Sequence, residues 1–212
     1  VLLPPPRIGF VEYDRPEWNS VWSACADLNM PLQTHLGATV PGQFTTYMKE
    51  PSPKYWGAIS AMEGARWQNY RGMHRMIFGG VFERYPNLKL IFTENETFWN
   101  HALIEMDLTY DACYDSLKDL VPKRPSEYVR SNVFCGASFM SKYEAKAAVQ
   151  GDWTENFMWG VDYPHPEGCW KAPEGVDEES TVKLHLRYSF CEIDPEDTLS
   201  FVGENAVRLY GL

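Results

Sequence analysis

Three residues that end short apolar segments have side chains able to bind a metal ion or transfer a proton. They are His35, Glu94 and Asp162. Apolar runs of this length, bounded by turn-forming residues, are typical of buried strands. In a parallel α/β barrel the carboxyl ends of the strands lie on one face, where catalytic residues gather. The three side chains can therefore converge although they are far apart in sequence.

Imidazole and carboxylate groups are the usual ligands of a catalytic divalent ion such as zinc or manganese. A bound ion that keeps one open position can lower the pKa of a water ligand to about 7. Asp162 could then orient that water and accept its proton. The convergence of these ligand-type side chains predicts one divalent metal ion. It predicts Asp162 and Glu94 as the catalytic residues.

Two loops carry further candidates. Asp162 is followed by a segment in which two prolines exclude regular structure. We expect His165, between those prolines, to contact substrate or to support a metal ligand, rather than to bind the metal itself. The region 38–58 is a long irregular segment rich in aromatic residues, and loops of this length in compact domains are usually functional. We interpret it as an active-site loop, with Tyr47 and Trp56 as substrate-binding residues.

Each chemical assignment has a structural alternative. A single histidine such as His35 is more often a hydrogen-bonded core residue. Glu94 could instead neutralise Arg66 or Arg71, and an aspartate at a strand end such as Asp162 can simply cap a turn. The proline-rich context after Asp162 favours a functional role at that position.

Helical and extended segments alternate along the chain. Alternation of this kind predicts a parallel sheet with right-handed crossovers. No glycine-rich phosphate-binding motif follows any strand, so a nucleotide-binding sheet has no support. Residues 119–131 form a polar, proline-containing connection. The expected strands are 31–35, 88–93, 132–135 and 157–161.

Composition narrows the class of protein. The chain has 212 residues, enough for one domain, and its net charge of −10 argues against nucleic acid and anionic membranes as partners. No apolar run is long enough to span a membrane. The five cysteines form no CxxC pair, which favours a reducing, cytoplasmic location. Residues 1–13 are proline-rich and resemble a linker, and the chain begins with Val1.

Four motifs together resemble the amidohydrolase superfamily. The resemblance is to its amidohydrolase-2 branch, which includes enzymes like aminocarboxymuconate-semialdehyde decarboxylase and γ-resorcylate decarboxylase. It runs over nearly the whole chain, so residues 1–212 are interpreted as one domain. The motifs are LNMPLQTHLG at 28–37, GGVFERYPNLKL at 79–90, WGVDYPH at 159–165 and GENAVRLY at 203–210.

The resemblance implies a metal-dependent TIM (β/α)8 barrel. His35 would be the metal ligand from barrel strand five, and Asp162 the ligand and base from strand eight. The chain would then supply strands five to eight. The N-terminal half of the barrel, with two more ligands from strand one, is expected outside this sequence. Residues 1–212 alone are therefore not expected to form a stable, active monomer.

The function implied is hydrolysis of a small carboxylated or cyclic organic substrate by metal-activated water. Non-oxidative decarboxylation is the alternative. The family's well-studied decarboxylases carry a histidine at the end of strand six, where this sequence has Glu94, and this difference favours hydrolysis. A catalytically inactive barrel used as a binding subunit is a third, less favoured reading. A homodimer is compatible with each of them.

Overall fold

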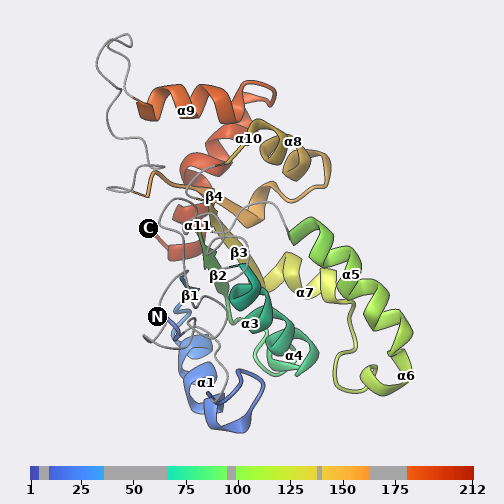
Figure 1. Ribbon diagram of the computed structural model, residues 1–212. Helices are drawn as coiled ribbons and strands as arrows, with labels where there is room; N and C mark the ends of the chain where they lie inside the picture. The colour runs from blue at the N-terminus through green and yellow to red at the C-terminus, as the bar shows by residue number, and fades with distance from the viewer. Residues whose placement is uncertain (5–9, 36–65, 95–98, 138–139, 163–180) are drawn as a thin grey trace, which may run out of the picture. The chain divides into compact units, whose positions relative to one another are not determined.

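The computed structural model describes residues 1–4, 10–35, 66–94, 99–137, 140–162 and 181–212. Two compact units make up the chain, Val1–Phe92 with His101–Val133 and Thr93–Asn100 with Phe134–Leu212. Helices and short strands alternate along the described residues, as the sequence predicts (Figure 1). None of the described helices is long and apolar enough to cross a membrane.

The strands are short and are separated by one or more helices. They are β1 (Leu32–Thr34), β2 (Leu90–Thr93), β3 (Val133–Ala137) and β4 (Phe157–Trp159). The helices before β3 are α1 (Asn19–Asp27), α3 (Arg66–Phe78), α4 (Val81–Arg84), α5 (Trp99–Ala112), α6 (Tyr114–Leu117) and α7 (Pro125–Asn132). Those after β3 are α8 (Lys142–Gln150), α9 (Thr181–Phe190), α10 (Pro195–Leu199), the π-helical turn η5 (Ser200–Glu204) and α11 (Asn205–Tyr210).

Parallel pairing joins the strands in sequence order, β1-β2-β3-β4. Leu32 of β1 lies opposite Leu90 of β2, and both are fully buried. The first residues of the chain also pair with β1, because the Leu3 N–H donates to the Gln33 carbonyl at 2.7 Å and the Gln33 N–H donates to the Val1 carbonyl at 2.8 Å. The residues of the four described strands are buried or half-buried and none is exposed, as is typical of parallel sheets covered on both faces.

Helix α7 lies almost entirely in the connection 119–131, which the sequence analysis described as polar and proline-containing without expecting a helix there. Pro125 occupies the first turn, where its missing N–H costs nothing. The Glu127 carboxylate accepts a hydrogen bond from the Arg124 N–H at 2.8 Å, as in a capping box. These start signals outweighed the polar composition of the segment.

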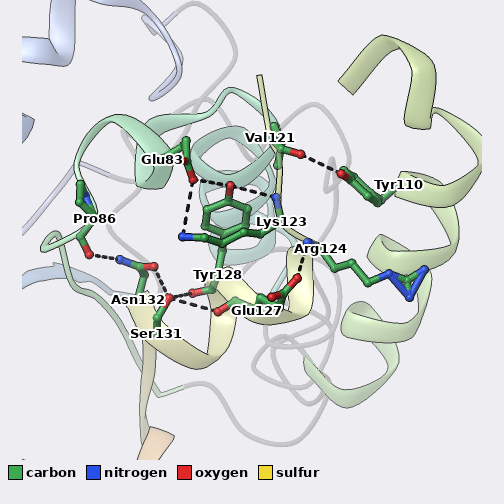
Figure 2. A network of polar contacts seen from close by, with 10 residues as sticks. All are labelled: Glu83, Pro86, Tyr110, Val121, Lys123, Arg124, Glu127, Tyr128, Ser131 and Asn132. Carbon is green, nitrogen blue, oxygen red and sulfur yellow. Dashed lines mark hydrogen bonds and ion pairs between the residues drawn. The ribbon is translucent and has the colours of Figure 1, made fainter. Parts of the chain in front are cut away.

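A polar network anchors α7 within the first unit (Figure 2). The Tyr128 hydroxyl donates to the Glu83 carboxylate at 2.7 Å. At the end of α7, the buried Asn132 amide donates to the carbonyls of Pro86 at 2.9 Å and Leu88 at 2.8 Å. These carbonyls belong to the segment that enters β2, so α7 fixes where that strand begins.

The second unit contains a corresponding arrangement at β4. The buried Asn205 amide, at the start of α11, donates to the carbonyls of Thr154 at 2.7 Å and Phe157 at 2.6 Å. The ring of Phe157 packs against Phe201 of η5, which stacks on Phe190 of α9. An apolar layer and a buried amide therefore hold the amino-terminal end of β4 against the following helices.

Candidate functional site

The three candidate residues lie at or just after the carboxyl ends of strands. His35 follows β1 directly and is exposed. Glu94 follows β2 directly and Asp162 lies three residues beyond β4; both are half-buried and belong to the second unit. The sequence analysis expected His35 and Glu94 at the ends of their strands, as the structure has them, whereas β4 ends at Trp159, two residues earlier than the expected strand 157–161. His35 belongs to the first unit.

Both carboxylate residues have a left-handed backbone conformation. The φ angle is 56° at Glu94 and 46° at Asp162. Outside glycine such angles are uncommon, and they concentrate where function requires an unusual direction of the chain. The conformation ends the extended backbone at these two positions. No sequence pattern had predicted it.

Asp162 is a candidate metal ligand with one buried carboxylate oxygen. Its Oδ2 atom is buried within the folded chain. A buried carboxylate must be compensated by hydrogen bonds, a positively charged side chain or a metal ion, because transfer out of water strongly disfavours an isolated negative charge. The carboxylate of Asp162 and the imidazole of His35 are donor types that zinc and manganese both accept.

A complete metal centre is not present among the described residues, where no group of three or more His, Cys, Asp or Glu side chains could hold an ion. The sequence analysis expected only two ligands from this chain, His35 and Asp162, with two more from the preceding half of the barrel. The assignment of these two ligands stays a prediction.

The substrate-binding candidates His165, Tyr47 and Trp56 lie outside the described residues, as does the loop 38–58. Their predicted roles stay predictions.

One polar group near Asp162 was not singled out by the sequence. The indole Nε1 of Trp159, the last residue of β4, is buried and has no acceptor among the residues that the structure describes. Its ring meets Phe190 of α9 edge to face, with ring centroids 6.4 Å apart. The contact with α9 indicates that the ring packs against the helix layer.

Another titratable residue, His74 of α3, is explained by packing. Its ring is stacked with Tyr70 at a centroid distance of 6.4 Å. Burial lowers the pKa of His74, and the nearby Glu105 carboxylate opposes this shift. The imidazole is therefore stabilised in its neutral form as part of the packing of α3, and we assign it no catalytic role.

Comparison with known proteins decides the family. The sequence profile of the amidohydrolase family (Amidohydro_2) matches residues 1–212. The chain belongs to this family. A 2-amino-3-carboxymuconate-6-semialdehyde decarboxylase from Dictyostelium discoideum is 30% identical to this amidohydrolase chain over 165 residues. The aligned region covers 77% of the chain and 42% of that decarboxylase.

Solved structures confirm the fold. The 5-carboxyvanillate decarboxylase from Sphingomonas paucimobilis matches with a TM-score of 0.73 at 22% identity, over 100% of this chain and 58% of its own. The Novosphingobium aromaticivorans enzyme of the same name, complexed with manganese and 4-hydroxy-3-methoxy-5-nitrobenzoic acid, matches with a TM-score of 0.73 at 17% identity. That match covers 100% of this chain and 56% of the solved one.

These matches confirm two expectations from the sequence. The resemblance to the amidohydrolase-2 branch was correct, and the α/β fold with a parallel sheet is that of part of the family's TIM barrel. The chain spans 42% of the curated relative and 58% of the first solved structure.

Proposed function

We propose that the complete protein containing this chain is a metal-dependent, non-oxidative decarboxylase of a small organic acid. The observation that carries the proposal is the 30% identity to a decarboxylase of the same family over 77% of the chain. The sequence analysis preferred hydrolysis and gave decarboxylation as the alternative. The relatives' reactions favour the alternative, since each of the three is named a decarboxylase.

Hydrolysis is the second candidate and has one observation in its favour. Glu94 is a carboxylate at the position where the family's well-studied decarboxylases carry a histidine. A carboxylate can serve either reaction. It can accept a proton from water in hydrolysis, or it can deliver one to carbon in decarboxylation when it is protonated. The residue type alone therefore does not reverse the preference for a decarboxylase.

In the proposed reaction, His35 and Asp162 would hold a divalent ion, zinc or manganese, together with ligands from elsewhere in the protein. The ion, when bound, would supply a Lewis acid that orients the substrate and stabilises its negative charge. The bond between the substrate carbon and its carboxyl group breaks, and the electron pair stays on that carbon. Glu94, as a carboxylic acid, donates the proton that replaces carbon dioxide, and it regains a proton from solvent.

The substrate of the proposed enzyme is a small acid. A homodimer and a cytoplasmic location stay predictions from the sequence.

Product analysis separates the two candidate reactions. The complete protein, loaded with manganese or zinc, is incubated with 5-carboxyvanillate and with 2-amino-3-carboxymuconate-6-semialdehyde, each isotopically labelled in its carboxyl group. We expect labelled carbon dioxide to be released in step with substrate loss. The reaction of 5-carboxyvanillate in water labelled with heavy oxygen should leave no more label in the organic product than a control without enzyme does. Incorporation of heavy oxygen without release of carbon dioxide would show that the enzyme is a hydrolase.

A further inference from the structure

Four residues other than glycine have a left-handed backbone in the described part of the chain. Three of them are asparagine or aspartate, whose short polar side chains hydrogen-bond locally and tolerate this conformation. Glu94 lacks this advantage because its side chain is one methylene longer. Its conformation is therefore the least favourable of the four for its residue type. The φ angles are 49° at Asn29, 56° at Glu94, 59° at Asp152 and 46° at Asp162.

The four residues also differ in location. Asn29 and Asp152 follow the helices α1 and α8, both are exposed, and left-handed residues are common just after helices. Glu94 and Asp162 follow the strands β2 and β4 instead. The two residues with a left-handed backbone beyond strands are thus the two carboxylates that the sequence assigned to catalysis.

The β-sheet holds the backbone that leads into Glu94. The preceding residues belong to β2, and the Glu94 N–H donates to the Gly136 carbonyl of β3 at 2.9 Å. The sheet therefore fixes the backbone up to the N–H of this residue, and the left-handed φ angle of 56° follows directly after it. Glycine would adopt the same conformation without a steric penalty.

We propose that Glu94 occupies this unfavourable position because the reaction needs its carboxylate at the end of β2, and that the site accepts a loss of stability in return. The inference rests on the proposed function, in which Glu94 donates the proton. The inference adds to that function that the residue with the unfavourable backbone conformation is also the residue that donates the proton. Strained residues that persist in a well-determined backbone are characteristic of active sites. Glycine at position 94 should therefore give a more stable and inactive enzyme.

The test compares Glu94→Gly with Glu94→Ala in the complete, metal-loaded protein. Both variants lose the carboxylate, but only glycine relieves the strain. We expect Glu94→Gly to raise Tm above that of the wild type by about 1–3 °C, because relief of a left-handed residue is worth about 1–2 kcal/mol and the Tm shift per kcal/mol falls as the protein becomes larger. Glu94→Ala should not raise Tm. Both variants should release labelled carbon dioxide about 100-fold more slowly or worse, with metal content unchanged.

Asn29→Gly is the matched control. It changes a left-handed residue that is exposed and follows a helix. Because asparagine already tolerates this conformation, we expect little change in Tm and wild-type turnover.

Two results would overturn the inference. One is wild-type turnover in Glu94→Gly, and the other is a Tm for Glu94→Gly no higher than that of Glu94→Ala.

If the wild-type protein releases no carbon dioxide from either acid, the proposed function fails by itself. Binding of 4-hydroxy-3-methoxy-5-nitrobenzoic acid to the manganese-loaded protein is then the readout. Removal of a contacting carboxylate should change Kd about tenfold or more in both Glu94 variants, and an unchanged Kd would overturn the inference.

Discussion

At the scale of single residues, Asp162 combines a buried carboxylate oxygen with a left-handed backbone just beyond β4. His35 brings an exposed imidazole directly after β1. Both side chains are suitable ligands for a divalent ion when His35 is neutral and Asp162 is ionised. The metal assignment is therefore best tested at these two residues.

We predict that Asp162→Asn and His35→Ala each lower the affinity of the complete protein for manganese or zinc by about 100-fold or more, since even residues that only support a ligand affect binding up to this extent. Metal content after dialysis, measured by mass spectrometry, gives the result. Asp152→Asn is the control, because it removes a carboxylate from an exposed left-handed position that follows a helix. Full occupancy after both site substitutions would exclude the proposed ligands.

At the scale of elements, two buried asparagines hold the segments from which β2 and β4 begin. Asn132, at the end of α7, binds the carbonyls of Pro86 and Leu88. Asn205, at the start of α11, binds the carbonyls of Thr154 and Phe157. In both cases an asparagine side chain on a helix donates hydrogen bonds to backbone carbonyls at or just before the first residue of the strand. The start of each strand is thereby fixed.

We predict that Asn205→Ala lowers the free energy of unfolding by about 1–3 kcal/mol, because it removes a buried hydrogen bond to the Phe157 carbonyl and a part-buried one to the Thr154 carbonyl. Urea denaturation of the complete protein measures this loss. Arg208→Ala is the control, since Arg208 donates to the Asn205 side chain at 2.8 Å from a partly exposed position. The control should lose clearly less stability. An equal loss in the two variants would mean that the amide bonds to the backbone are not the main contribution.

At the scale of the molecule, the described strands are of the buried, parallel type. In such barrels the side chains that fill the interior come from strands all around the circumference. This chain spans 58% of the first solved structure that it matches. Large apolar side chains are also exposed in the described residues, among them Leu28 at 70% and Leu108 at 64%.

We predict that residues 1–212 expressed alone do not form a stable monomer, because strands and apolar surface that a barrel would cover remain open to water and to other chains. Gel filtration and thermal melting test this, with zinc or manganese titration as the functional readout. Large assemblies or a melt without a cooperative transition are expected. A soluble monomer that melts cooperatively and binds metal tightly would show that the segment is self-sufficient.

The sequence by itself determined the order of strands and helices and the residues that follow the strands. His35, Glu94 and Asp162 were found because an apolar run that ends in a polar residue is a local pattern, readable within a few positions. The resemblance to the amidohydrolase-2 family was also found from local patterns, because it depended on short sequence motifs. The helix α7 was missed although its start signals at Pro125 and Glu127 are also local, because the polar composition of its surroundings was given more weight.

Only the tertiary structure decided the left-handed backbone at Glu94 and the roles of Asn132 and Asn205. The conformation of Glu94 is set where β2 ends and its N–H meets the Gly136 carbonyl, which lies 42 positions later in the sequence numbering. Asn205 similarly satisfies carbonyls from a segment about 50 residues earlier, with a separation of 51 to Thr154 and 48 to Phe157. A hydrogen bond between distant segments depends on how the chain folds back on itself, and no local pattern of residue types contains that information.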